Sequence, residues 1–101
     1  MKCIKELTEH IYEEIEDAKA YALQALEMKD VDRSLGDTYI TIAKEEMSHM
    51  SRLHDQVTRI INDYRNQKGE PPEAMLQIYN WEHKKIMTSA AEAQVIINNY
   101  K

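Results

Sequence analysis

Apolar side chains recur along almost all of this chain at alternating steps of three and four residues. This spacing places side chains on one face of an α-helix, so the pattern predicts an all-α fold. Breaks in the pattern lie at about residues 29–33 and at 68–73, where Gly69 is followed by two prolines. We therefore expect an antiparallel helical hairpin at about 4–28 and 32–67, and a third helix at about 73–101. A length of 101 residues predicts one domain, residues 1–101.

Charged and polar residues interrupt these apolar stripes at a few positions. The stripe of the first helix reads Ile4, Leu7, Ile11, Glu14, Ala18, Tyr21, Ala25, Met28. The stripe of the second reads Leu35, Tyr39, Ile42, Glu46, His49, Leu53, Gln56, Ile60. Burying a carboxylate without a partner costs several kcal/mol. Two carboxylates and an imidazole on buried faces therefore need a shared partner, and a metal ion is the simplest one.

The hairpin geometry predicts that Glu14, Glu46 and His49 meet. Residues equally distant from the turn of an antiparallel pair lie at the same height. The midpoint of Glu14 and Glu46 is residue 30, and that of Glu14 and His49 falls between 31 and 32. A Glu-x-x-His pair alone is a weak signal, since chance gives roughly half a match in this composition. Oxygen-rich ligation with one imidazole favours iron or manganese over a structural zinc.

Composition excludes several classes of function. The net charge of -5 argues against nucleic acid as the main partner. No run of 18 apolar residues occurs, so we expect no membrane span. The segment 1–6 has no apolar signal region, which favours a cytoplasmic protein. Cys3 is the single cysteine, so no internal disulfide is expected.

Two segments resemble the ferritin-like di-iron carboxylate family. Residues 14–21 carry the family's Glu with a Tyr seven residues later, and residues 45–49 look like its Glu-Glu-x-x-His. The resemblance covers about residues 7–61. A full ferritin or rubrerythrin has two such helix pairs, whereas this chain has one pair and a single further helix. The resemblance is therefore closest to the encapsulated ferritin-like proteins, short chains that complete the site across a dimer.

This resemblance implies a ferritin-like four-helix bundle completed by dimerisation, in a homodimer or larger homo-oligomer. Glu14, Glu46 and His49 of both chains would be its metal ligands and catalytic residues, holding two Fe²⁺ per dimer, with Mn or Zn as alternative metals. The implied activity is ferroxidase-type: an oxidoreductase that oxidises Fe²⁺ with dioxygen. A storage compartment is an implied partner, because one small chain encloses no space for bulk iron.

Other interpretations of the same residues stay open. The metal site could handle peroxide, or the chain could be a non-catalytic helical assembly or adaptor protein in which a buried polar network sets the register. The third helix has the stripe Met75, Tyr79, Glu82, Ile86, Ala90, Ala93, Ile97, Tyr100. Glu82 lies in that stripe and Glu92 at the height of the site, so each is a candidate extra ligand. His10 and His54 share a height and are a candidate second site.

A few residues have a purely structural interpretation beside a functional one. Tyr21 is either a core residue or a hydrogen-bonding partner of the site. Trp81 and His83 are interpreted as packing and surface residues. The acidic group is interpreted as a solvated face that could also attract iron, and comprises Glu6, Glu9, Glu13, Glu16, Asp17.

Overall fold

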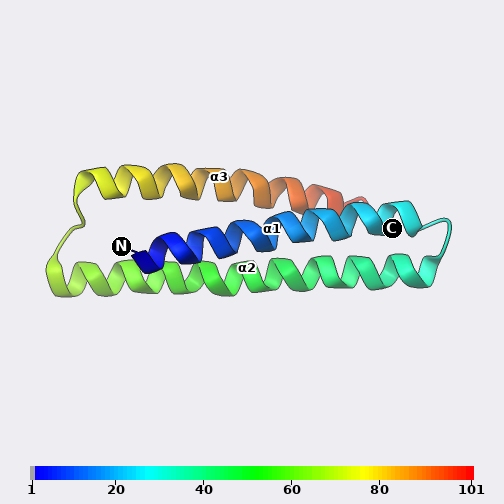
Figure 1. Ribbon diagram of the computed structural model, residues 1–101, viewed down its shortest axis with the longest axis horizontal. Coiled ribbons are helices and arrows are strands. Elements are labelled where there is room, and N and C mark those ends of the chain that lie inside the picture. Colours follow the sequence, from blue (N-terminus) through cyan, green and yellow to red (C-terminus); the bar gives the residue numbers. More distant parts are fainter. Residues whose placement is uncertain (1) are drawn as a thin grey trace.

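The computed structural model describes residues 2–101, and these fold into three long helices with no strand among them. Helix α1 spans Lys2–Met28, α2 spans Arg33–Lys68 and α3 spans Glu73–Asn98. They form an elongated bundle of 55 × 18 × 18 Å, in which α1 and α2 make an antiparallel hairpin and α3 returns alongside them (Figure 1). Met1, the first residue of the expected domain, lies outside the described residues.

The helix ends follow from local chemistry at the two breaks. Asp32 is the N-cap of α2, because its carboxylate accepts a hydrogen bond of 3.2 Å from the backbone N–H of Leu35. Gly69 ends α2 with a φ of 83°, a conformation that favours glycine. Pro72 precedes α3 and needs no N–H partner there. The observed bounds of α1 and α2 differ from the expected ones by one or two residues.

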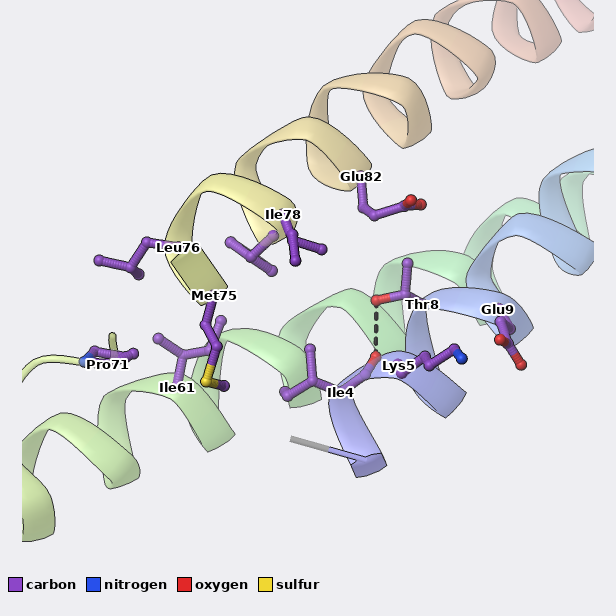
Figure 2. A pocket seen from close by; sticks show the side chains of 11 residues that line it. Ile4, Lys5, Thr8, Glu9, Ile61, Pro71, Met75, Leu76, Ile78 and Glu82 are labelled. Carbon is purple, nitrogen blue, oxygen red and sulfur yellow. Dashed lines mark hydrogen bonds between the residues drawn. The ribbon is translucent and has the colours of Figure 1, made fainter. Parts of the chain in front are cut away.

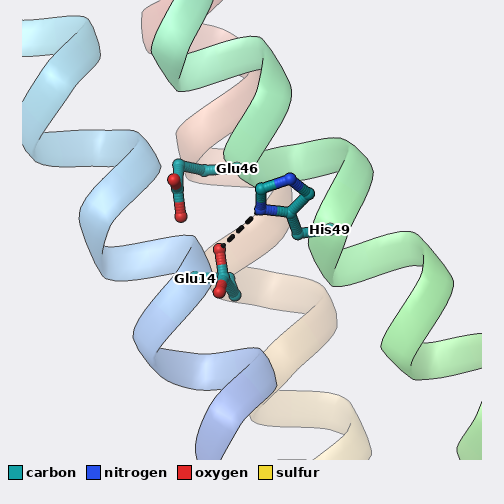
Figure 3. Close-up of side chains that lie close together, drawn as sticks. All are labelled: Glu14, Glu46 and His49. Carbon is teal, nitrogen blue, oxygen red and sulfur yellow. Dashed lines mark ion pairs between the residues drawn. The ribbon is translucent and has the colours of Figure 1, made fainter.

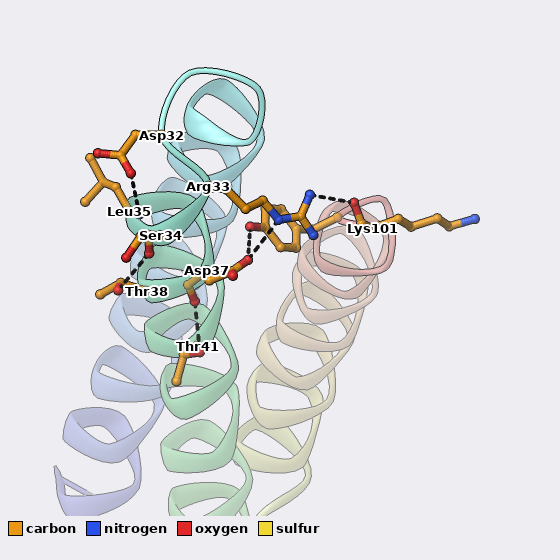
Figure 4. Close-up of polar contacts among 9 residues, drawn as sticks. Asp32, Arg33, Ser34, Leu35, Asp37, Thr38, Thr41 and Lys101 are labelled. Atoms are coloured by element: carbon orange, nitrogen blue, oxygen red, sulfur yellow. Dashed lines mark hydrogen bonds and ion pairs between the residues drawn. The ribbon is translucent and has the colours of Figure 1, made fainter.

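Helix α3 ends at Asn98, before the expected residue 101, and the last residues contact the start of α2. The Tyr100 hydroxyl donates a hydrogen bond to Asp37 and lies against Gly36. Arg33 pairs with Asp37 at 3.2 Å and donates a bond of 3.0 Å to the carbonyl of Lys101 (Figure 4). These contacts fix the end of the chain beside the hairpin turn.

The core lies along the axis shared by the three helices. Its buried apolar residues are Ile11, Ile15, Ala18, Ala22, Ala25, Ile40, Ala43, Met50, Val57, Ile61, Ile86, Ala93, Ile97. On α1 and α2 this differs from the predicted buried face. Ile15 and Ala22 are fully buried, while Glu14 and Tyr21 beside them are only half-buried. On α2 the buried positions fall one residue later than predicted, so the predicted phase of the buried face is wrong for this helix.

The physical reason for the difference is that each hairpin helix has an apolar arc wider than one stripe. One edge of the arc faces the centre of the bundle. The other edge lies along the α1–α2 seam on the side that α3 leaves uncovered. We call this edge the open seam, which comprises Leu7, Glu14, Tyr21, Tyr39, Ile42, Glu46, His49, Leu53. The predicted stripe of the second helix misses the buried core and contains the open-seam residues of α2. The predicted stripe of the first helix alternates between open-seam residues and the core residues Ile11, Ala18 and Ala25.

Helix α3 packs mainly on α1 and touches α2 little. At the 69–72 loop the ends of α2 and α3 extend beyond the start of α1 (Figure 1). A mostly apolar cavity of about 610 Å³ remains there between the helices. Ile4 and Thr8 of α1, Ile61 of α2, and Met75 and Glu82 of α3 line it (Figure 2).

Candidate metal centre

Three donor side chains converge near the middle of the hairpin. Glu14 comes from α1, and Glu46 and His49 lie one turn apart on α2, so all three point into the same space (Figure 3). One donor atom from each lies within 4.8 Å of the others. The short turn at 29–32 places these positions at one height. The structure thus brings together the three residues that the sequence singled out as ligands.

Glu14 lacks a hydrogen-bond partner for part of its carboxylate. Its Oε2 atom is buried and accepts no hydrogen bond among the described residues. Nδ1 of His49 lies 3.4 Å from this oxygen, which is too long for a good hydrogen bond. A buried carboxylate oxygen without a donor is costly unless a cation or a proton neutralises it. Neutralising this oxygen therefore requires a proton or a cation close to it.

Glu46 shares the negative charge of this cluster. A hydrogen bond with Glu14, burial and the Glu14 charge together raise the pKa of Glu46 from 4.5 to about 7, while His49 opposes the shift. Two carboxyl groups so close cannot both ionise freely in the absence of a cation. At neutral pH the metal-free cluster consequently retains a proton for part of the time. A divalent cation would replace that proton.

The cluster lies on the side of α1 opposite to α3. Helix α3 contacts α1 through Ser89, which donates to Glu16 at 3.2 Å, and through Glu92, which pairs with Lys19 at 2.9 Å. Glu14 and Glu16 are two residues apart, which separates their directions by roughly 200° on a helix. Exposure agrees with this position, since the side chains of Glu14 and His49 are 27% and 49% exposed. The site is open along the seam that α3 leaves uncovered.

Apolar and aromatic side chains flank the cluster along the open seam. Toward the hairpin turn, the rings of Tyr21 and Tyr39 stack with centres 6.1 Å apart. Toward the other end, Leu7 and Leu53 are half-buried and pack against the core. Tyr21 therefore bridges α1 and α2 two turns from Glu14. Half-buried apolar side chains thus lie on both sides of the polar cluster.

The other candidate ligands lie elsewhere. Glu92 is exposed and paired with Lys19, and Glu82 lines the cavity near the loop. Neither belongs to the converging group. His10 is exposed, and His54 contacts His83 instead, with its Nε2 atom 3.1 Å from that of His83.

His83 differs from its sequence interpretation, whereas the exposure of the acidic residues of α1 agrees with the interpretation of a solvated face. His83, interpreted as a packing or surface residue, is half-buried and joins α3 to α2 through His54. His54 lies 14 residues before the end of α2, and His83 lies 10 residues after the start of α3. Their distances from the loop thus differ by one helical turn, so residue spacing alone could predict this contact only to within one turn. The acidic residues of α1 are exposed, comprising Glu6, Glu9, Glu13, Glu16, Asp17.

Comparisons with protein-family models, with curated proteins and with solved structures find nothing that matches this chain. Among residues 2–101, no helix combines the length and apolar character that crossing a membrane requires.

Proposed function

We propose that this protein binds iron at a ferritin-like di-iron centre between two copies of the chain and oxidises Fe²⁺ with dioxygen. The observation that carries the proposal is the convergence of Glu14, Glu46 and His49 on the open seam, with a buried Glu14 oxygen left without a donor. The cluster has the ligand types of a di-iron site but half of the number. A cytoplasmic location accompanies the proposal.

A second copy of the chain would complete the site. One chain supplies two carboxylates and one imidazole, and a two-fold axis through the open seam doubles this set. Four carboxylates balance the charge of two divalent ions. The half-buried apolar residues that flank the cluster, among them Leu7, Ile42 and Leu53, would be covered by the same residues of the partner. Metal binding and association are therefore one process in this proposal.

The residues divide the chemistry between them. Fe²⁺ is the substrate, and the carboxylates of Glu14 and Glu46 bind it through oxygen while His49 contributes a nitrogen. Dioxygen takes up the electrons that the two ferrous ions release on becoming ferric. The negative charge of the carboxylates favours the ferric product because it compensates the added positive charge. Storage of the product would take place in a larger assembly or a separate compartment.

Iron binding and iron oxidation test the proposal separately. We expect Glu46→Ala combined with His49→Ala to lower Fe²⁺ affinity at least tenfold under anaerobic conditions. The matched control is Glu82→Ala, a half-buried glutamate outside the cluster. In air, the unaltered protein should raise the near-ultraviolet absorbance of ferric iron faster than buffer alone, and Glu14→Ala should return the rate to that of buffer.

The outcomes separate the alternatives. Equal Fe²⁺ affinity in the unaltered protein and the double variant would exclude the metal site and favour a polar network in an assembly protein. Tight Fe²⁺ binding with an oxidation rate equal to that of buffer would exclude the ferroxidase activity. Faster consumption of hydrogen peroxide than of dioxygen by the iron-loaded protein would favour peroxide handling.

A further inference from the structure

Two histidines face each other across the seam between α2 and α3, away from the carboxylate cluster. His54 and His83 approach with their Nε2 atoms 3.1 Å apart. The ring centres lie 5.2 Å apart and the ring planes are inclined by 35°. Both side chains are half-buried, so solvent ions reach the pair. The open-seam residues do not include either histidine.

We propose that His54 and His83 bind one divalent transition-metal ion of the Zn²⁺, Cu²⁺ and Ni²⁺ class through their Nε2 atoms. Two imidazole nitrogens on one tetrahedral zinc ion, at a bond length of about 2.0–2.1 Å, stand roughly 3.3 Å from each other. The centres of the two rings then stand roughly 5.2 Å apart. Both distances in the protein agree with these values to within a few tenths of an ångström. To admit the ion, the two side chains would rotate so that both Nε2 atoms face it.

A neighbouring aromatic ring holds His83 in place. Tyr79, one turn earlier on α3, stacks on His83 with ring centres 5.8 Å apart and planes 30° apart. Tyr79 itself packs against the core. Burial raises the pKa of Tyr79, so it remains an uncharged phenol beside the pair. The orientation of the His83 ring is thus set before any ion arrives, which lowers the entropic cost of binding.

The donor set distinguishes this pair from the carboxylate cluster. Among residues 2–101, the one group of three or more close carboxylate, imidazole or thiol donors is Glu14, Glu46 and His49. The histidine pair therefore offers two nitrogens, and water fills the remaining positions. Neutral imidazoles suit Zn²⁺, Cu²⁺ and Ni²⁺, whereas Fe²⁺ and Mn²⁺ are held better by carboxylates. The two sites would select different metals.

An ion at this position would fasten α3 to α2. The two helices touch little, and the His54–His83 contact is the one side-chain hydrogen bond that joins them within the described residues 2–101. Replacing a single shared proton by two metal–nitrogen bonds would restrain the position of α3 along its middle. The ion would also stabilise the folded chain in proportion to its concentration, because the unfolded chain does not hold the two imidazoles together.

Zinc binding to a variant that lacks the other site tests the proposal. In the Glu46→Ala, His49→Ala background, calorimetric titration with ZnCl₂ should show one Zn²⁺ per chain. Adding His54→Ala or His83→Ala should lower this affinity at least tenfold. His10→Ala is the matched control, because it removes an exposed histidine outside the pair and should leave the affinity unchanged. Zinc affinity that is indifferent to both pair substitutions would overturn the proposal.

A measurement on the unaltered protein keeps the test valid if a variant fails to fold. The chain has four histidines, so their ring signals can be resolved by NMR during a zinc titration. The signals of His54 and His83 should shift together, and the ring of His10 should not respond. Shifts at His49 alone would assign zinc to the carboxylate cluster and overturn the proposal, as would a titration that leaves the pair unchanged.

Discussion

Glu46 is the residue whose protonation most directly reports on the carboxylate cluster. Its pKa is raised from 4.5 to about 7 in the folded chain by the hydrogen bond with Glu14, by burial and by the Glu14 charge. Between these pH values the folded state binds more protons at Glu46 than the unfolded state does. The contribution to stability is thus present below about pH 4.5 and is lost as the pH rises through 7. At neutral pH the metal-free protein is therefore less stable than it would be with Glu46 fully protonated.

We predict that Glu46→Gln removes this loss. The amide retains the shape and cannot ionise, so the metal-free variant should be more stable than the unaltered chain at pH 8, by on the order of 1 kcal/mol after allowance for solvent screening. At pH 4.5 the two should be alike. Urea unfolding at both pH values measures this, with Glu45→Gln, an exposed neighbour, as the control. If the variant and the unaltered chain differed in their free energy of unfolding by the same amount at both pH values, the effect of the substitution would not come from ionisation of Glu46.

The sequence was sufficient to predict that Glu14, Glu46 and His49 meet, because helix rise and a short turn determine the height of each residue. It was not sufficient for the proton on Glu46 or for the His54–His83 contact. The first depends on how near the Glu14 carboxylate lies and on how much solvent reaches it. The second depends on how α3 leaves the 69–72 loop, which shifts the level of facing residues by one turn. Neither quantity is encoded in residue spacing.

At the scale of elements, the start of α2 is fixed by close packing around Gly36. A Cβ atom at this position would lie 3.0 Å from the Tyr100 hydroxyl, 3.2 Å from the carbonyl oxygen of Ala25 and 3.3 Å from the backbone nitrogen of Lys29. Two of these neighbours are backbone atoms, one in the last turn of α1 and one in the turn that follows it, and they cannot move independently of the hairpin. The hairpin turn and the end of the chain consequently approach α2 closely only because this residue has no side chain.

We predict that Gly36→Ala destabilises the protein even though alanine is the better helix former. Helix propensity alone would favour alanine by about 0.5–1 kcal/mol. Overpacking against α1 typically costs about 1–3 kcal/mol and should dominate, with a lower midpoint of thermal unfolding. Ser51→Ala, at an exposed position on the same helix, is the control that reports propensity alone. A higher midpoint of thermal unfolding for Gly36→Ala would show that Tyr100 and the turn move to accommodate the added methyl group without loss of stability.

The identity and number of the helices could be predicted from the apolar spacing and the two breaks, but the rotation of α1 and α2 about their axes could not. Ile15 and Glu14 are neighbours in sequence and both lie on the apolar arc of α1. Which of them faces the centre depends on where α3 packs, and α3 packs on the side of Glu16 and Lys19. Only the placement of the third helix therefore separates the core from the open seam.

At the scale of the whole molecule, the bundle has a covered side and an uncovered side. Helix α3 closes the first. The second carries Glu14, Glu46 and His49 between half-buried apolar residues. Part of the stripes that the sequence presents as buried faces lies on this uncovered side, whereas Ile11, Ala18 and Ala25 of the stripe of the first helix lie in the core. In the proposed dimer, the half-buried apolar residues of this uncovered side would be covered by the partner.

This arrangement predicts that metal drives association. The metal-free dimer would bring four carboxylates together and should be weak at neutral pH, whereas a dimer holding divalent ions is neutralised at its centre. In sedimentation at low micromolar concentration, Fe²⁺ or Mn²⁺ should shift the protein from monomer toward dimer, with one metal per chain. Glu14→Ala should abolish the shift, while Glu92→Ala, which removes an exposed glutamate on the α3 side, should not.

Because zinc would also bind at the histidine pair, Fe²⁺ and Mn²⁺ are the informative ions. A chain that binds two of these ions and stays monomeric would show that α3 or its surroundings supply the missing ligands, and that the open seam has another role.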